Sequence, residues 1–338
     1  MAKSRSVGSQ IILELLEKFP NTPTLTLAKK AYKENSCVWS NLEACRSAIR
    51  QYRGNNGEVN RKETKHKDHY KPNGKAGEKW ADVIPPPLKH FEDWKAVQYD
   101  GPLKALVLSD IHIPYHDSES LGLALDYGLE HKANFVLLNG DIIDNYGVSH
   151  WETDPRKRNF AGEIRSLKTF LSGIRRMFPR ARICYHLGNH EERYERYMIR
   201  KAPELLDVPE FKWEHIVGLS EEHIELVKER RPVRLGELNV IHGHEYKFQI
   251  TSPVNPARGI YLRAKTHALA GHFHQTSQHS EKSLEQKVIS TWSTGALCDL
   301  HYEHGPLNNH NHGFAFVEVG KGGSFQVDNH RIINGKIW

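Results

Sequence analysis

The chain has 338 residues, of which 38% are hydrophobic and 26% charged, so its apolar side chains suffice for a sizeable core and for about two domains. Its apolar runs are short and none approaches the ~18 consecutive apolar residues of a membrane helix, nor does the N-terminus lead into a secretory signal. We therefore expect a soluble, cytoplasmic protein with no membrane partner. The four cysteines are dispersed, which argues against a disulfide framework or a zinc knuckle.

The formal charge of +6 is concentrated in the front of the chain. Residues 1–100 hold 18 Lys and Arg against 12 Asp and Glu, whereas residues 101–338 hold 29 against 29. Histidine is distributed the other way, with 19 of 22 after residue 100. A basic front part suggests a polyanionic partner, although a solvated charged surface is the simpler alternative. The histidines suggest a catalytic or metal-binding second part.

Three short helices are predicted at the N-terminus. Apolar side chains recur at helical spacing over residues 9–19 and again over 26–34. Ser40-Asn-Leu-Glu43 is a capping-box pattern that opens a third helix, and Gly54 closes it. Residues 1–54 are thus predicted to form a small all-α domain.

The predicted third helix has a basic face. Arg46, Arg50 and Arg53 are spaced by four and three residues, so they share one side of the helix. This arrangement resembles a helix-turn-helix module with a basic recognition helix, which predicts nucleic-acid binding by the three arginines. The alternative is a helical bundle that docks on the catalytic domain or forms an oligomer, and the oligomeric state stays open.

Residues 55–79 are almost devoid of apolar side chains, so they cannot contribute to a core. They are predicted to be a polar, basic linker between the helical module and a catalytic domain over residues 80–338.

After residue 100, short β-rich runs each end in a polar cluster. The runs cover residues 105–108, 135–138, 183–187, 238–241 and 267–270. Helical patterns lie between several of them, which indicates a layered α/β domain. Such folds place ligands at the carboxyl ends of their strands, so the polar clusters are expected to converge on one edge.

The polar clusters form five motifs in a fixed order. They read DxH (Asp110, His112), GDxxD (Asp141, Asp144), GNHE (Asn189, His190, Glu191), HGH (His242, His244) and GHxH (His272, His274). Together they resemble the calcineurin-like metallophosphoesterase family across about residues 103–318. The tail from Ser293 to Cys298 with Gly313-Phe314 is similar to that of family members in phages and mobile elements. The resemblance implies a layered metallophosphoesterase β-sandwich flanked by helices, here with the small all-α N-terminal domain.

The chemistry of the motifs agrees with that resemblance. Two divalent metals clamp the attacking and leaving oxygens of an in-line displacement and activate water. Carboxylates and imidazoles without thiolates suit manganese, and also iron, zinc or nickel, and one anionic oxygen must bridge both ions. The resemblance implies that Asp110, His112, Asp141 and His274 hold the first metal. It implies that the second is held by Asp141, Asn189, His242 and His272, with Asp141 as the bridge.

Four further residues receive roles. His190 would face the substrate and stabilise the phosphoryl charge or protonate the leaving oxygen, with Asp144 as its acidic partner. Either histidine of HGH could bind metal. His242 is favoured because it directly follows the predicted strand, which leaves His244 to reach the substrate. Arg193 could supply a cation for the substrate.

The substrate follows less directly, because fold and metals fix only the reaction class. Protein phosphatases of the superfamily usually carry an Arg where this chain has Asn145. A basic module on a polar tether suits a polymer, because tethering raises the effective concentration of the catalytic site. We therefore expect a metal-dependent phosphodiesterase that acts as a DNA nuclease. The alternatives are a phosphatase or phosphodiesterase for small or cyclic nucleotides or phosphoproteins and, more remotely, a non-catalytic DNA-binding protein.

Overall fold

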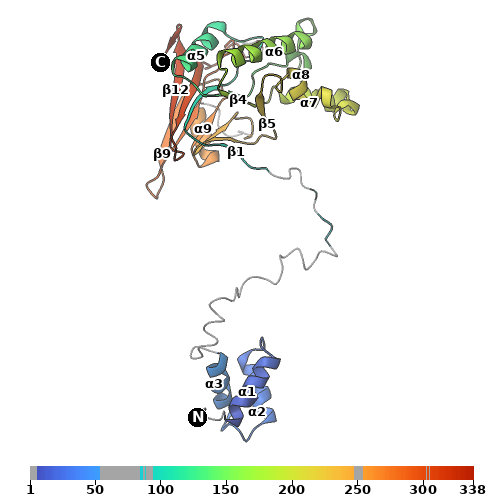
Figure 1. The fold of residues 1–338 in the computed structure, drawn as a ribbon, viewed down its shortest axis with the longest axis vertical. Helices are drawn as coiled ribbons and strands as arrows, with labels where there is room; N and C mark the ends of the chain where they lie inside the picture. Colours follow the sequence, from blue (N-terminus) through green and yellow to red (C-terminus); the bar gives the residue numbers. More distant parts are fainter. Residues whose placement is uncertain are drawn as a thin grey trace. The chain divides into compact units, whose positions relative to one another are not determined.

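Residues 6–53, 84–86, 88, 94–246, 254–301, 303 and 305–338 are described by a computed structural model of the chain. The chain divides into two compact units, Met1–His90 and Phe91–Trp338 (Figure 1). The predicted linker 55–79 lies outside the described residues. The extent of the linker and the three-part division of the chain therefore stay predictions.

Three helices make up the described part of the first unit. They are α1 (Val7–Lys18), α2 (Thr24–Glu34) and α3 (Leu42–Arg53). Their buried faces pack together through Ile12, Leu27, Ala28, Ala31, Cys45 and Ile49. The helices coincide closely with the predicted segments because the apolar residues recur at the spacing of one helix face.

The third helix starts differently from the prediction. Asn41 Oδ1, not the Ser40 hydroxyl, accepts the backbone N–H of Ala44 at 2.8 Å. Asn41 is therefore the N-cap, and Ala44 stands at the third helical position that a capping box would give to Glu43. The predicted capping box is wrong by one residue, and Glu43 instead pairs with arginines further along the helix.

The second unit contains two sheets. The seven-stranded sheet has the order β13-β12-β11-β2-β3-β4-β5, and the six-stranded sheet has the order β1-β6-β7-β8-β10-β9. The strands are β1 (Val97–Tyr99), β2 (Leu103–Leu108), β3 (Phe135–Asn139), β4 (Arg182–His186), β5 (Ile224–Val227), β6 (Val233–Leu235), β7 (Leu238–Ile241), β8 (Ala268–Ala270), β9 (Ser277–Lys282), β10 (Val288–Ser293), β11 (His312–Val319), β12 (Phe325–Ile333) and β13 (Lys336–Ile337). β2 to β5 run parallel to one another, and β7 runs parallel to β8.

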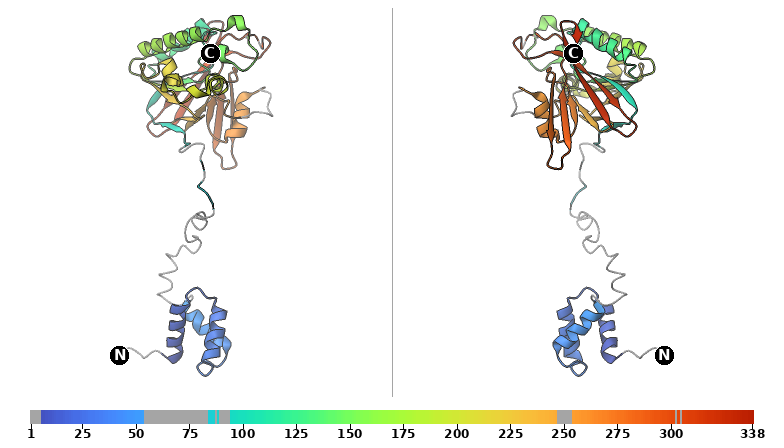
Figure 2. Two further views of the ribbon diagram at one scale, coloured as in Figure 1. Left: turned by 90° about the vertical axis from the view of Figure 1, so that its right-hand side faces the viewer. Right: turned by 90° about the vertical axis from the view of Figure 1, so that its left-hand side faces the viewer.

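Helices flank the sheets. The described helices of the second unit are α5 (Ser118–Glu130), α6 (Phe160–Met177), α7 (Glu192–Lys201), α8 (Trp213–Val217) and α9 (Pro256–Ala264), with short 3-10 turns at Tyr146–Val148, Pro155–Lys157, Pro203–Leu205 and Pro209–Phe211. α5 and α6 lie along the seven-stranded sheet, whereas α9 lies beside the strands of the six-stranded sheet (Figures 1 and 2). The arrangement is the predicted layered β-sandwich flanked by helices.

Successive side chains of the central strands point to opposite faces of the sheet and so contribute to two separate hydrophobic cores. In β2, Val107 faces the six-stranded sheet, where it joins side chains such as Val240 and Leu269. The neighbouring Leu106 and Leu108 face the opposite way, into the core shared with α5 and α6. Because both faces of β2 are buried from Ala105 to Leu108, this stretch is continuously apolar, which allowed the strand to be predicted from the sequence.

Among the residues that the structure describes, no helix combines the length and the apolar character needed to cross a membrane.

Candidate metal centre

The candidate site residues lie on loops that follow five strands. The loops after β2, β3 and β4 carry the first three motifs, and the loops after β7 and β8 carry the last two. The first three strands belong to the seven-stranded sheet and the other two to the six-stranded sheet. The predicted convergence on one sheet edge is therefore wrong in one respect, because strand ends from two sheets meet at the site.

Five of the candidate ligands have left-handed backbone conformations. The φ angles are 55° at Asp110, 51° at His112, 53° at Asp141, 68° at His272 and 52° at His274. For a residue other than glycine this conformation costs about 1–3 kcal/mol, and it persists only where the surrounding structure enforces it. The fold therefore enforces the backbone conformation at these five positions and with it the direction of each side chain.

One group of candidate ligands gathers around the loop after β2. Ligand atoms of Asp110, His112 and Asp141 lie within 4.8 Å of one another. His274 joins them from the other sheet, with its Nε2 3.2 Å from Asp110 Oδ1. The backbone N–H of His272 donates to Asp110 Oδ2 at 2.8 Å and so fixes that carboxylate. The structure thus brings together all four residues predicted for the first metal.

A second group gathers around His242. Ligand atoms of Asp141, His242 and His272 lie within 4.8 Å of one another, and Asn189 Oδ1 lies 3.3 Å from His242 Nε2. His242 Nδ1 donates to the backbone carbonyl of Asn139 at 2.9 Å, which leaves Nε2 directed at the group. Burial and the nearby His242 lower the pKa of His272 to about 4, so its imidazole is neutral at pH 7, the form that binds metals.

Asp141 belongs to both groups. Its Oδ2 lies 3.1 Å from His242 Nε2 in the second group and 4.0 Å from His112 Nε2 in the first. Its Oδ1 accepts the backbone N–H of His190 at 2.8 Å, which fixes the orientation of the carboxylate. Burial opposes ionisation, but His242 and His190 outweigh it and hold the pKa of Asp141 well below its usual value. Asp141 is placed as a bridging anion would be.

The residues present fit two divalent ions. Carboxylates, imidazoles and one amide oxygen form the mixed oxygen and nitrogen donor set of such ions. Among the described residues, His112 Nε2 is buried and has no hydrogen-bond partner, as expected of an atom reserved for a ligand. Two glycines make room for the groups. A Cβ at Gly188 would lie 2.3 Å from Asp141 Oδ1, and one at Gly140 would lie 2.4 Å from His242 Nδ1.

Glu191 connects two of the ligand loops, those that follow β3 and β4, through hydrogen bonds. This buried carboxylate accepts the backbone N–H groups of Asp141 at 3.0 Å, Ile142 at 2.9 Å and Gly188 at 2.8 Å, and the Tyr185 hydroxyl at 2.8 Å. Burial, together with Asp141, raises the pKa of Glu191. Glu191 belongs to the GNHE motif, but no role was predicted for it from the sequence. The sequence shows that Glu191 follows Asn189 and His190, but it cannot show which backbone N–H groups the carboxylate binds.

His190, Asp144 and Arg193 form one contact group beside Asp141. His190 Nδ1 lies 3.0 Å from Asp144 Oδ1, and its Nε2 lies 3.8 Å from Asp141 Oδ2. Arg193 donates to His190 Nε2 at 2.8 Å and to the Asp144 carbonyl at 2.9 Å. Burial disfavours the imidazolium, but Asp141 and Asp144 outweigh it and raise the pKa of His190. The predicted catalytic pair and the predicted substrate cation therefore lie together at the centre.

His244 lies next to the second group and contacts the carboxylates of Glu192 and Glu245. Its Nε2 lies 3.0 Å from Glu192 Oε1, and Glu192 is also paired with Arg230 at 2.6 Å. The side chain of His244 is only 6% exposed. The structure thus places His244 close to His242 but hydrogen-bonded to Glu192, which is itself ion-paired with Arg230, and its substrate role stays a prediction.

The three arginines of α3 have different surroundings. Arg46 and Arg50 lie 3.3 and 3.7 Å from the carboxylate of Glu43 on the same helix. Arg53 donates instead to the carbonyls of Phe19 and Pro20 at 3.2 and 3.0 Å, and also to that of Thr22. Arg53 therefore joins α3 to the segment between α1 and α2, a structural contact that helical spacing could not show.

Comparisons with known proteins agree with this geometry. Residues 103–308, more than half of the chain, match the family model described as calcineurin-like phosphoesterase. The chain is 25% identical over 259 residues to the Gene 54 protein of Mycobacterium phage L5, an alignment that covers 70% of this chain and 98% of that protein. It is 26% identical over 251 residues to the Gene 54 protein of Mycobacterium phage D29, covering 67% of this chain and 97% of that protein.

Two solved structures are also similar. One is a single mutant of Vps29 from Entamoeba histolytica, with a TM-score of 0.35 and 12% identity over 70% of this chain and 96% of that one. The other is Yfce, a phosphoesterase from E. coli, with a TM-score of 0.32 and 14% identity over 66% of this chain and 96% of that one.

Proposed function

Because the chain belongs to the calcineurin-like phosphoesterase family, we propose that it is a phosphodiesterase that hydrolyses nucleic acid, specifically DNA, with two divalent metal ions. The observation that carries the reaction class is the shared carboxylate of Asp141 between two groups of candidate ligands. The first ion would be held by Asp110, His112, Asp141 and His274. The second would be held by Asp141, Asn189, His242 and His272. When bound there, two divalent ions would polarise the phosphoryl oxygens and supply the attacking water.

The protein's own contribution to bond cleavage centres on His190. The leaving oxygen needs a proton, and His190 can donate one from Nε2 once Arg193 turns from that nitrogen to the substrate phosphate. Asp144, at 3.0 Å from Nδ1, would stabilise the imidazolium and fix the ring. Arg193 would then neutralise phosphoryl charge within reach of both residues.

A diester is favoured over a monoester by the surroundings of residue 145. A monoester dianion is gripped by an Arg at this place in protein phosphatases of the superfamily. Asn145 is buried here and donates through Nδ2 to the His190 carbonyl at 2.9 Å. Asn145 carries no positive charge that could bind a dianion. Its side chain instead forms a hydrogen bond with the backbone of the active site.

A polymeric substrate is supported by the first unit. Over residues 6–53 it carries seven Lys and Arg against four Glu, an excess of three positive charges. The ion pairs of Arg46 and Arg50 with Glu43 lie at the surface, where such pairs contribute little free energy. Both arginines can therefore exchange the carboxylate for a phosphate of DNA.

Hydrolysis assays test the proposed reaction. The purified chain, loaded with Mn²⁺, is given bis-p-nitrophenyl phosphate, p-nitrophenyl phosphate, and labelled single- and double-stranded DNA. Asp141→Asn removes the bridging anion and serves as the blank, and the exposed Asp126→Asn is the matched control. We expect the wild type and Asp126→Asn to cleave the diester and DNA, and Asp141→Asn to cleave neither. Hydrolysis confined to the monoester would make the protein a phosphatase and refute the proposal.

DNA affinity as a function of salt tests the role of the first unit. Replacing Arg46 and Arg50 together by alanine should weaken binding and reduce the salt slope by about 1 for each phosphate that the protein no longer neutralises. Replacing the exposed Arg165 and Arg176 of α6 by alanine is the matched control, with no change in slope expected. An unchanged slope in the first variant would point to a docking or assembly role for the helical unit.

A further inference from the structure

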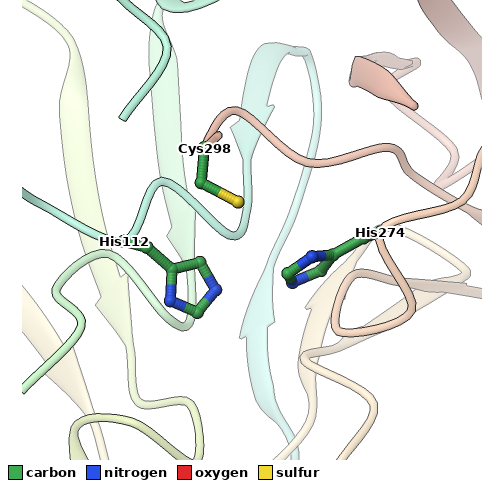
Figure 3. Close-up of side chains that lie close together, drawn as sticks. All are labelled: His112, His274 and Cys298. Atoms are coloured by element: carbon green, nitrogen blue, oxygen red, sulfur yellow. The ribbon is translucent and has the colours of Figure 1, made fainter. Parts of the chain in front are cut away.

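Cys298 lies beside the first group of candidate metal ligands. Its sulfur and ring nitrogens of His112 and His274 all lie within 4.8 Å of one another. Figure 3 shows the sulfur directed into the gap between the two imidazole rings. The residue is only 3% exposed. None of the five sequence motifs contains this cysteine, which ends the tail from Ser293 to Cys298, and the dispersed spacing of the four cysteines indicates no metal site.

The backbone holds Cys298 at this place from both sides. The N–H of Leu297 donates to the Asp110 carbonyl at 3.0 Å, and the N–H of Asp299 donates to the Tyr115 carbonyl at 2.8 Å. Cys298 itself forms an isolated β-bridge with His116. The loop that carries the sulfur is therefore paired directly with the loop that carries Asp110 and His112, and this pairing fixes the backbone of Cys298 beside those ligands.

The contacts of the sulfur match those between the candidate ligands. The Cys298 sulfur lies within 4.8 Å of a ring nitrogen of His274, just as His274 lies close to Asp110 and His242 lies close to Asp141. Donor atoms that share one ion lie close enough to contact one another. His112 belongs to the same cluster, and its buried Nε2 has no hydrogen-bond partner among the described residues. It is the atom that an ion between these three residues would engage.

We propose that Cys298 is a sulfur ligand of the metal ion held by Asp110, His112, Asp141 and His274. On binding the ion, the thiol releases its proton to solvent and the thiolate forms the bond. This inference rests on the proposed metal centre and adds a donor of a different kind. Thiolate favours Zn²⁺ or iron, whereas carboxylate and water ligands suit Mn²⁺. The first position therefore prefers Zn²⁺ over Mn²⁺ more strongly than its oxygen and nitrogen ligands alone would dictate.

Cobalt spectroscopy of the full-length, metal-free protein tests the assignment without an activity measurement. Co²⁺ bound at either position gives weak visible absorption, and a sulfur ligand adds a near-ultraviolet charge-transfer band. We expect both signals in the wild type. In Cys298→Ser the charge-transfer band should vanish and the visible absorption should remain. The exposed Cys37→Ser is the matched control and should keep both.

The outcomes separate this inference from the proposed function. Visible absorption without a charge-transfer band in the wild type, or a band that persists in Cys298→Ser, overturns the role of Cys298 and leaves the metal centre intact. Failure of the wild type to bind Co²⁺ at all overturns the metal centre too. If Cys298→Ser does not fold, Cys298→Ala takes its place, and the wild-type spectrum alone can still overturn the inference.

Competition between metals tests the predicted preference. The ratio of Zn²⁺ to Mn²⁺ affinity, measured by equilibrium dialysis, should fall about 10-fold or more in Cys298→Ser, an effect in the range seen when the surroundings of a metal are altered. An unchanged ratio contradicts the proposed preference.

Discussion

Replacing Glu191 by glutamine tests whether this carboxylate holds the metal centre together. Glu191 Oε2 accepts the N–H groups of Asp141 and Gly188, and Oε1 accepts the N–H of Ile142 and the Tyr185 hydroxyl. A glutamine amide has an oxygen at only one of these two positions, so its NH₂ group must face two donors at the other. The Tyr185 hydroxyl can rotate to accept, but a backbone N–H cannot. At least one buried N–H is therefore left without an acceptor.

The magnitude follows from these contacts. A buried donor without a partner costs about 1–3 kcal/mol, and a hydrogen bond to a charged group contributes about 1.5–3 kcal/mol. We expect Glu191→Gln to lower the free energy of unfolding of the second unit by about 3 kcal/mol. Affinity for metal should fall as well, because the loops of Asp141 and Gly188 lose their common anchor.

Urea unfolding, followed by fluorescence and by hydrogen exchange of the β3 and β4 amides, measures this change. Exchange is needed because the two units can unfold separately. The exposed Glu195→Gln on α7 is the matched control and should stay within about 0.5 kcal/mol of the wild type, as surface substitutions do. A Glu191→Gln protein equally close to the wild type would refute the anchoring role.

Three further substitutions give separate tests. His190→Ala should retain both metals but lose about 10²-fold or more in kcat, and metal loss measured by elemental analysis would show that a ligand has been misassigned. Burial alone would raise the pKa of Glu192, but the hydrogen bonds from its partner Arg230 lower it from 4.5 to about 2. The ionised form of Glu192 therefore stabilises the fold above pH 4.5, and this contribution is lost as the pH falls towards 2. Glu192→Gln should therefore cost about 3 kcal/mol at pH 7 in urea unfolding and progressively less below pH 4, and a pH-independent difference would contradict this. Gly188→Ala should destabilise the second unit by about 1–3 kcal/mol and weaken metal binding, because the new Cβ would lie 2.3 Å from Asp141 Oδ1. Gly173→Ala is the control, since nothing lies within 4 Å of its Cβ position, and it should not destabilise the protein in the same thermal unfolding assay.

The strands and the polar residues after them could be predicted because both are local features. The predicted run 238–241 is the whole of β7, and 135–138 falls one residue short of the end of β3. Residues 135–138 of β3 form a buried, continuous apolar run, and β7 has three buried apolar residues out of four; each strand ends where the chain turns into a polar loop. The division of the five strands between two sheets was not predictable in this way, since it depends on pairings between residues far apart in the sequence.

Side-chain roles that depend on tertiary contacts were missed for the same reason. Helical spacing places Arg53 on a face with Arg46 and Arg50, but its donors meet the carbonyls of Phe19 and Pro20 from another segment. Cys298 ends the family-like tail but lies outside the five ligand motifs, and the pairing of its loop with residues 110–116 brings it to the metal ligands. A spacing rule cannot report contacts that are set by loop pairing.

The proposed function assigns bond cleavage and DNA binding to different units of the chain. The alignment with the phage L5 protein covers 98% of that protein but 70% of this chain, so about three tenths of this chain has no aligned counterpart there. The centre built on Asp141 lies within the family match at residues 103–308 and needs no residue of α1, α2 or α3. If the helical unit supplies DNA affinity, replacing Arg46 and Arg50 must raise KM for DNA while kcat and the turnover of bis-p-nitrophenyl phosphate stay unchanged. A loss of turnover on the small diester would instead mean that the helical unit supports the catalytic unit itself.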